Sequence, residues 1–292
     1  MDEKLTITRA QLAQLKEYSG QCIARIVGCT SGDAGEVIGT GTFIDVRNTI
    51  YLLTAQHVSA QRFATNAHGD RLYDGLAHDG GPDDEMFRIR NPTLGYGFPR
   101  DIAIARLHSE DLGAPTLIPM QWDRIPKFAG NLEKDIFFVH GYPGRKSRFV
   151  RAWGGIASES FPWVATEEPC NCSWFDPKIH IAIGYPVQGQ DERGHLIDLP
   201  HPEGLSGSAL WKTNIASKGS NWEPEDSKIV GIIIQWDQDS QTLIATRIEY
   251  VQTLVLHVIQ RESAYFRWER RGRSHGDDQA DWFAAEEDIS LL

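Results

Sequence analysis

The sequence lacks any long run of apolar residues, and this absence limits where the protein can reside. Its uninterrupted apolar stretches are the length of a strand, well short of the roughly 20 residues that a membrane-spanning helix needs. Residues 1–6 also lack the apolar segment of a secretory signal. We therefore expect a soluble, cytoplasmic protein that has no membrane partner.

Positive charge is also in short supply. Lysine and arginine together number 29, against 40 aspartates and glutamates, which gives a formal net charge of −11. Such a chain repels a phosphate backbone, so nucleic acid is not expected as a partner. The one basic run, residues 267–273, precedes an acidic segment at 276–292. We interpret that segment as a solvated, mobile tail, with an acidic and aromatic docking segment as the alternative.

Cysteine is scarce, since the 292 residues include only Cys22, Cys29, Cys170 and Cys172. So few cysteines do not indicate the disulfide framework of a secreted protein. The C-x-C pair at 170–172 suggests zinc, but structural zinc sites use C-x2-C spacing, and the other two cysteines lie in a predicted strand. Reduced, partly buried thiols are the favoured interpretation, and neither a metal nor another cofactor is expected.

Alternating apolar and polar residues predict many short strands. Turn-forming segments such as residues 79–82 and 142–144 separate them. This pattern is typical of an antiparallel sandwich or barrel and not of alternating strands and helices. The predicted strands span residues 22–28, 37–46, 50–54, 102–107, 136–140, 149–156, 179–183, 208–211, 229–235 and 242–248.

One helix is predicted at each end of this run of strands. Thr8 and Gln11 match a capping box, which predicts an N-terminal helix, and Gly20 is expected to end it. Near the C-terminus, apolar residues recur every three or four positions and predict a helix with one apolar face. That face consists of Ile248, Val251, Leu254, Val255, Val258 and Ile259.

Three short segments carry residues suited to nucleophilic catalysis. His57 follows the apolar run 50–53, Asp101 precedes an alternating strand, and Ser206 lies in a glycine-flanked turn before another strand. A serine hydroxyl is a weak nucleophile until a neighbouring histidine takes its proton, and a buried carboxylate fixes the tautomer of that histidine. Each residue alone is a weak signal, but together they favour a catalytic triad.

The glycines around Ser206 have a second expected role. They let the backbone turn so that the N–H groups of Gly204 and Ser206 can point at one spot, where a substrate carbonyl becomes an oxyanion. Removing one such donor costs roughly 3–4 kcal/mol in known hydrolases, so the turn is as necessary as the triad. We therefore expect the oxyanion hole at Gly204 and Ser206.

In these segments the chain resembles the trypsin-like serine peptidases. The matching motifs are T-A-x-H at 54–57, D-I-A-x-x-x-L at 101–107 and G-x-S-G at 204–207, with further likeness at 39–44, 231–234 and 246–251. The resemblance covers roughly residues 20–260. It implies an all-β fold of two packed six-stranded antiparallel β-barrels, with the triad at their junction. The expected domains are a helical extension (1–20), the peptidase domain (21–262, with the barrel junction near 115–135) and a basic, then acidic tail (263–292).

Departures from the family pattern suggest closer kinship with intracellular bacterial, HtrA-like members than with digestive zymogens. Residues 25–28 look like a zymogen cleavage site, but Leu205, directly before the expected nucleophile, cannot pair with a new ammonium group. The glycine that the family usually has two positions after the nucleophile is Ser208 here, a small change. No activation by cleavage is expected.

The resemblance also suggests a substrate pocket. If residues 231–236 and 242–247 are the strands that line the cleft, Gln235, Trp236 and Leu243 bind substrate. Trypsin-type enzymes keep glycine where Trp236 and Leu243 stand, so a shallow pocket for a small or uncharged residue is expected. Asp198, His201 and Glu203 are interpreted as solvated loop residues, with a charged pocket base as the alternative.

The function that the resemblance implies is that of a serine endopeptidase acting on protein or peptide substrates without a cofactor. The alternative is a catalytically silent protease fold that binds a partner peptide, which the presence of both His57 and Ser206 disfavours. Because a cytoplasmic protease must be restrained, a regulatory protein partner is also expected. The N-terminal helix, the polar loop 212–228 and the tail are candidate control elements.

Overall fold

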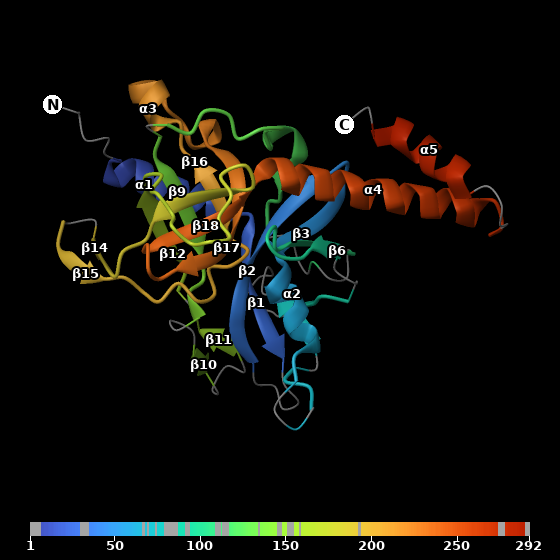
Figure 1. Cartoon of the computed structure of the whole chain (residues 1–292), viewed down its shortest axis with the longest axis horizontal. Coiled ribbons are helices and arrows are strands. Elements are labelled where there is room, and N and C mark those ends of the chain that lie inside the picture. The colour runs from blue at the N-terminus through green and yellow to red at the C-terminus, as the bar shows by residue number, and fades with distance from the viewer. Residues whose placement is uncertain are drawn as a thin grey trace.

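Two curled β-sheets lie side by side in the computed structural model, with helices at both ends of the chain (Figure 1). The structure describes residues 7–29, 35–65, 68, 70–73, 75–78, 87–90, 94–108, 112, 117–133, 135–144, 148–150, 155–157, 159–191, 194–273 and 278–289.

The first sheet has the order β5-β4-β1-β2-β3-β7-β6, and β8 pairs with β2 in parallel. Within the described residues it therefore has eight strands, where six were expected. The additional pairings involve strands of two residues, such as β5 and β8, which are too short to show an alternating pattern. The strands are β1 (Ile23–Cys29), β2 (Gly35–Val46), β3 (Thr49–Ala55), β4 (Gly75–His78), β5 (Phe87–Arg88), β6 (Leu94–Tyr96), β7 (Ile102–Arg106) and β8 (Met120–Gln121).

In the part of the chain that the structure describes, the second sheet has six antiparallel strands, as expected, in the order β12-β9-β16-β17-β18-β13. They are β9 (Phe137–Gly141), β12 (Phe161–Ala165), β13 (His180–Gly184), β16 (Ala209–Lys212), β17 (Lys228–Asp237) and β18 (Thr242–Arg247). Two small pairs lie outside it. They are β10 (Arg148–Val150) with β11 (Gly155–Ala157), which divide the single strand predicted at 149–156, and β14 (Gln188–Gln190) with β15 (Leu196–Asp198).

One hydrophobic core runs through both sheets. Phe43, Leu52 and Ile104 of the first sheet and Phe138 and Trp211 of the second are all buried. Burying each such side chain contributes about 1.5–3 kcal/mol relative to leaving it in water. Two curled antiparallel sheets sharing a core, with a helix at each end, form the chymotrypsin-like two-barrel fold that the sequence predicts.

The N-terminal helix α1 spans Arg9–Gly20 and begins as predicted. The hydroxyl of Thr8 accepts a hydrogen bond from the Gln11 N–H, and the Gln11 side chain accepts one from the Thr8 N–H. At the other end of the helix, Ser19 Oγ is hydrogen bonded to Nδ1 of His140, at 2.8 Å. The helix is therefore attached to β9 of the second sheet.

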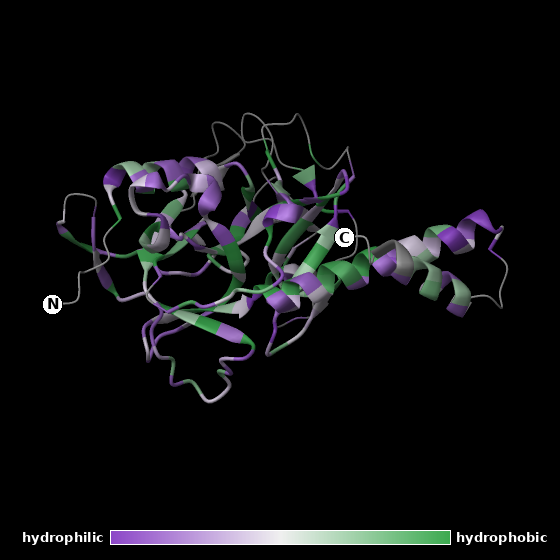
Figure 2. Cartoon of the chain, turned by 90° about the horizontal axis from the view of Figure 1, so that it is seen from above, coloured by the Kyte–Doolittle hydropathy of each residue, from purple (hydrophilic) through white to green (hydrophobic). Residues whose placement is uncertain are grey.

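The C-terminal helix α4 spans Ile248–Arg270 and buries the predicted apolar stripe as far as Val258. It extends past residue 262, so the predicted domain boundary falls inside it. The second part of the expected tail is also helical. Helix α5 (Asp278–Ile289) turns back along α4, and the two form an arm that projects from the sheets (Figure 2).

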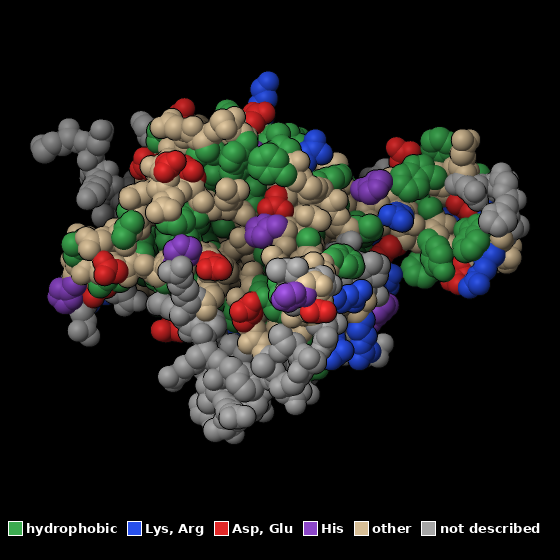
Figure 3. Space-filling model, turned by 60° about the horizontal axis from the view of Figure 1, so that its bottom comes forward, with side chains coloured by type: hydrophobic (Ala, Val, Ile, Leu, Met, Phe, Trp, Pro, Cys, Tyr) green, Lys and Arg blue, Asp and Glu red, His purple; other side chains and the backbone are tan. Residues whose placement is uncertain are grey.

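Contacts between α4 and α5 explain why this segment is ordered. Asp281 is buried and paired with Arg271, and the ring of Trp282 packs edge-on against His257 at 5.7 Å. Tyr265, Phe266 and Phe283 remain exposed, and Figure 3 shows hydrophobic side chains on the surface of the arm. The favoured interpretation of a solvated, mobile tail is therefore wrong for residues 278–289.

Shorter helical elements connect the strands. They are α2 (Gln56–Ala60), η1 (Gln61–Phe63), η4 (Trp122–Arg124), α3 (Ile215–Lys218), η6 (Gly219–Asn221) and η7 (Pro224–Asp226). Within the described ranges, no helix combines the length and apolar character needed to cross a membrane.

Candidate active site

The pairing of β3 with β7 brings His57 next to Asp101, although 44 residues separate them in the chain. Ala55 at the end of β3 lies opposite Ile102 at the start of β7. His57, in the first turn of helix α2 (Gln56–Ala60), therefore lies beside Asp101, the residue that precedes β7. The Nδ1–H of His57 donates to Asp101 Oδ2 at 2.6 Å, and the His57 backbone N–H donates to Asp101 Oδ1 at 2.8 Å.

This carboxylate is well placed to orient the imidazole. Both of its oxygens accept a hydrogen bond from the same residue, which fixes the ring and puts the Nδ1 proton on the Asp101 side. The side chain of Asp101 is 15% exposed and that of His57 is 46% exposed. The carboxylate is thus partly shielded, whereas the imidazole faces open space.

The turn that carries Asp101 is held by the second sheet. Asp101 has a positive φ of 46°, a conformation that costs about 1–2 kcal/mol for most residues. His180 of β13 donates from Nε2 to the Pro99 carbonyl at 2.8 Å, and Thr246 of β18 donates to the Arg100 carbonyl. Burial lowers the pKa of His180, and the Asp176 N–H donates to its Nδ1 at 3.1 Å, which requires the neutral ring with its proton on Nε2. These two bonds stabilise the turn from outside its own sheet.

The turn that carries Ser206 depends on two glycines with positive φ. Gly204 has φ 95°, and a Cβ there would lie 2.5 Å from the Tyr142 carbonyl oxygen. Gly207 has φ 93°, and a Cβ there would collide with the Thr40 carbonyl. No other residue fits at either position without moving backbone, which explains the G-x-S-G pattern.

Residues of β2, in the first sheet, hold the turn that carries Ser206. The Thr40 N–H of β2 donates to the Ser206 carbonyl at 2.8 Å, and Thr40 Oγ1 donates to the Gly204 carbonyl at 2.8 Å. Thr42 Oγ1 donates to the Gly207 carbonyl at 3.1 Å. Thr40 and Thr42 are fully buried. Each of the two turns is therefore fixed by side chains of the opposite sheet.

The N–H groups of Gly204 and Ser206 are left without a protein acceptor among the described residues. The Glu203 carbonyl accepts a hydrogen bond from the Gly144 N–H at 2.6 Å, and the Gly204 carbonyl is bound by Thr40. Because a peptide N–H points away from the carbonyl of the same peptide, anchoring the Glu203 carbonyl directs the Gly204 N–H to the other side. Two free N–H groups on such a turn can bind an oxyanion.

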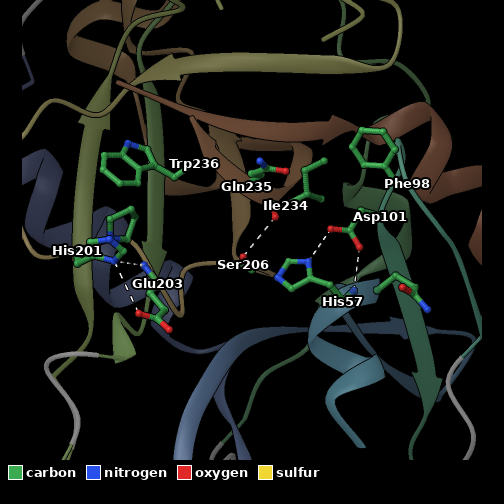
Figure 4. Close-up of a pocket in the computed structure, with 11 residues that line it drawn as sticks. His57, Phe98, Asp101, His201, Glu203, Ser206, Ile234, Gln235 and Trp236 are labelled. Carbon is green, nitrogen blue, oxygen red and sulfur yellow. Dashed lines mark hydrogen bonds and ion pairs between the residues drawn. The ribbon is translucent and has the colours of Figure 1, made fainter. Parts of the chain in front are cut away.

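Ser206 itself lies beside the imidazole of His57, on the side away from Asp101 (Figure 4). Its hydroxyl donates to the Ile234 carbonyl at 3.4 Å, and within the described part of the chain it makes no hydrogen bond to His57. Hydrogen bonds of catalytic groups are often long or poorly aligned without substrate and tighten when it binds. The three side chains are adjacent, and the bond between serine and histidine is not formed.

A cleft of about 520 Å³ opens over these residues. Of the residues predicted to bind substrate, Gln235 and Trp236 line it, but Leu243 does not, because it is buried opposite Trp236 in the β17–β18 pair. Asp198 lies in β15, outside the lining. The lining consists of Gln56, His57, Phe98, Asp101, His201, Pro202, Glu203, Ser206, Ile234, Gln235 and Trp236.

One side of the cleft is formed by His201, Glu203 and Trp236. The rings of His201 and Trp236 meet edge-on at 5.3 Å, and the Glu203 N–H points at Nδ1 of His201 at 3.4 Å. The indole N–H of Trp236 points at the Tyr185 carbonyl at 3.4 Å. His201 and Glu203 therefore contribute to the cleft, where solvated loop positions were the favoured interpretation.

Several supporting residues could not be identified from the sequence. Thr40, Thr246, His180 and Gly144 act through contacts with segments more than 50 residues away. Thr40 lies in the G-T-G segment that resembles the peptidases, and this was the one available signal. Within the described ranges, no group of three or more His, Cys, Asp or Glu side chains could hold a metal ion.

The fold is that of the trypsin-like serine peptidases. The chain matches solved structures of serine proteases. One is the Rv3671c protease from M. tuberculosis, at 16% sequence identity over 86% of this chain and 87% of that chain, with a TM-score of 0.43. Another is the serine endoprotease from Yersinia pestis, at 12% identity over 88% of this chain and 68% of that chain, with a TM-score of 0.49. It also matches the serine protease domain of the Sesbania mosaic virus polyprotein, at 15% identity over 78% of this chain and 89% of that chain, with a TM-score of 0.40. With TM-scores below 0.5, these likenesses add nothing to the fold assignment, which follows from the sheets and helices themselves.

The helical arm gives a different match. Residues 261–290 match the family described as "Protein of unknown function (DUF2934)". They comprise the end of α4, all of α5 and the segment between them. No curated protein matches the chain significantly.

Proposed function

We propose that this protein is a serine endopeptidase in which Ser206 is the nucleophile, His57 the general base and Asp101 the residue that orients the imidazole. The observation that carries the proposal is the convergence at Ser206 of an imidazole fixed by a carboxylate at 2.6 Å and two peptide N–H groups that have no acceptor among the described residues.

The reaction follows from these positions. Ser206 Oγ attacks the substrate carbonyl carbon while its proton passes to Nε2 of His57, and Asp101 stabilises the imidazolium. The N–H groups of Gly204 and Ser206 bind the oxyanion. The intermediate then expels the amine, which takes the proton from His57 and leaves an acyl group on Ser206. Water attacks this ester, its proton passes through His57 to Ser206, and the carboxylic acid leaves.

The cleft supports a primary pocket that accepts small or uncharged side chains. This specificity rests on Trp236, which lines the cleft with its indole N–H directed at the Tyr185 carbonyl, where trypsin-type enzymes keep glycine. A profile of cleaved peptides dominated by Lys or Arg before the scissile bond would contradict this specificity.

Labelling with a fluorophosphonate tests the proposed chemistry without knowledge of the substrate. The wild-type protein should become labelled on Ser206, as located by peptide mapping, and Ser206→Ala should abolish labelling. His57→Ala should slow it by about 10³-fold or more, because the base is gone. Ser208→Ala is a matched control, since the Ser208 hydroxyl is buried two residues away and the variant should label at the wild-type rate.

One observation favours a second function. The Ser206 hydroxyl points at the Ile234 carbonyl and not at the imidazole. A protein that keeps this arrangement would bind a peptide in the cleft without cutting it. Folded wild-type protein that resists labelling at every pH from 6 to 9, while trypsin is labelled beside it, would support this binding module over the peptidase.

A further inference from the structure

Two cysteine side chains lie together in the loop that connects β12 to β13. Cys170 Sγ and Cys172 Sγ are 3.1 Å apart, and neither forms a disulfide. A disulfide has a sulfur–sulfur distance near 2.05 Å, so a movement of about 1 Å would join them. Both residues are partly exposed, unlike Cys22, which is 1% exposed. Small molecules can therefore reach the pair from solvent.

The surroundings of the pair distinguish its two thiols. The turn between β17 and β18 contributes Ser240, whose hydroxyl lies 3.7 Å from Cys170 Sγ. Burial raises the pKa of Cys170, but hydrogen bonds from Cys172, Ser240 and Thr242 outweigh this effect and lower its pKa overall. Burial, followed by the neighbouring Cys170 and Asp237, raises the pKa of Cys172 to about 11. Cys170 therefore loses its proton at a lower pH than Cys172, and a thiol of lowered pKa beside a second thiol is the arrangement found in dithiols that exchange with disulfides.

A metal is a weaker explanation for the pair. Structural zinc sites need four ligands, and no cluster of even three candidate side chains occurs in the described part of the chain. The hydroxyls of Ser240 and Thr242 lie beside Cys170, and hydroxyls are poor partners for zinc in proteins.

We propose that Cys170 and Cys172 form a redox-active dithiol that closes to an intramolecular disulfide by exchange with low-molecular-weight disulfides such as oxidised glutathione. Cys170 thiolate attacks one sulfur of oxidised glutathione, forms a mixed disulfide and releases one glutathione thiolate. Cys172 then loses its proton and attacks the Cys170 sulfur, which releases the second glutathione. The two cysteines are oxidised, and one molecule of oxidised glutathione is reduced to two of reduced glutathione.

The loop that carries Cys170 and Cys172 also contacts a residue that lines the cleft. Trp174, two residues after Cys172, packs edge-on against Phe98 and against His180, each at 5.1 Å. Phe98 lines the cleft, and His180 holds the turn that carries Asp101. A covalent change at the pair therefore occurs in a loop that supports the wall of the cleft. The exchange chemistry itself does not depend on the proposed peptidase activity.

The test follows the oxidation state of each cysteine in the full chain. Fully reduced protein is equilibrated in glutathione buffers of increasing oxidised fraction, quenched with acid and alkylated with N-ethylmaleimide. Peptide mass spectrometry then reads each site. As the oxidised fraction of the buffer rises, we expect the peptide containing Cys170 and Cys172 to change from a form with two alkylated cysteines to a form with an internal disulfide and no alkyl group. Cys22, whose pKa burial raises to about 12, should stay reduced at every ratio.

Single variants separate an internal disulfide from other chemistry. Cys172→Ser should stop at the mixed disulfide on Cys170, whereas Cys170→Ser should take up glutathione at least several-fold more slowly. Circular dichroism confirms that the variants are folded. The proposal is overturned if both thiols of the wild-type protein are alkylated at every ratio, or if each carries its own glutathione without an internal bond. Bound zinc that is present in the purified wild-type protein and absent from Cys170→Ser would also overturn it in favour of a metal site.

Discussion

Replacing Thr40 with valine tests whether the first sheet holds the turn that we propose to bind the oxyanion. Thr40 is fully buried in β2, and its hydroxyl has two partners. It donates to the Gly204 carbonyl at 2.8 Å and accepts from the Tyr142 N–H at 3.0 Å. Valine has nearly the same shape, and the Thr40 backbone N–H still reaches the Ser206 carbonyl. The substitution therefore removes two hydrogen bonds and little packing.

The magnitude follows from those two bonds. Each buried group that loses its partner costs about 1–3 kcal/mol, so the free energy of unfolding should fall by about 2–6 kcal/mol. The Gly144 contact to the Glu203 carbonyl fixes the peptide that contains the Gly204 N–H, and the Thr40 contact to the Gly204 carbonyl fixes the next peptide of the same turn. Losing a hydrogen bond that contributes about 1 kcal/mol lowers the equilibrium ratio of the correctly oriented turn to other orientations about fivefold. We therefore expect fluorophosphonate labelling of Ser206 to slow by about 5- to 10-fold.

The assay compares the second-order labelling rate with the free energy of unfolding from urea titration. Thr213→Val is the control, because Thr213 is equally buried, lies outside the cleft and accepts a bond from the Ile215 N–H at 3.4 Å. It should lose stability and keep its labelling rate. The reasoning is refuted if Thr40→Val loses stability as expected but labels within twofold of the wild-type rate, or if Thr213→Val slows labelling equally.

Three further changes have defined outcomes. Asp101→Asn should lower the labelling rate by about 10³–10⁴-fold while the protein stays folded, because an amide can hold the imidazole in the wrong tautomer; equal rates at neutral pH would remove Asp101 from the site. Burial, with a smaller contribution from Lys16, lowers the pKa of His140 to about 3, so the unfolded chain binds a proton between about pH 6.5 and pH 3 that the folded chain does not. Stability should therefore fall as the pH drops through that window, by up to about 1.4 kcal/mol per pH unit, and His140→Asn should flatten the dependence of urea midpoints on pH; an unchanged slope would show that other groups cause it. Trp236→Gly should open the pocket wall and shift cleavage of a peptide library toward large side chains before the scissile bond, and an unchanged profile would mean that Trp236 does not limit the pocket.

Much of the fold could be predicted because local patterns carry it. The Thr8 capping box, the apolar stripe of α4 and most long strands depend on neighbours within a few residues, and each was found close to its predicted bounds. His57 and Asp101 were recognisable for the same reason, since each stands directly beside a strand of clear pattern. Their contact then follows from one register, Ala55 opposite Ile102.

Other features depend on partners far away in the chain. The two-residue strands β5 and β8 exist only because a longer strand pairs with them. Helix α5 has no strong apolar stripe, and it is ordered by contacts such as the pair of Arg271 with Asp281 and the packing of Trp282 on His257. Leu243 was assigned to the cleft from its strand, but the pairing with Trp236 buries it. Composition and periodicity do not contain this information.

The contacts between the sheets explain why the candidate site needs both of them. Asp101 at φ 46°, Gly204 at 95° and Gly207 at 93° adopt conformations that a short segment does not hold by itself. The Asp101 turn is fixed by His180 and Thr246 of the second sheet, and the Ser206 turn by Thr40 and Thr42 of the first. Because every one of these bonds crosses between the sheets, the two turns gain this stabilisation only when the sheets are packed. The geometry on which the proposed chemistry depends is therefore a property of the packed pair of sheets. A substitution that loosens their contact should slow labelling of Ser206 even when it leaves His57, Asp101 and Ser206, the proposed triad, in place.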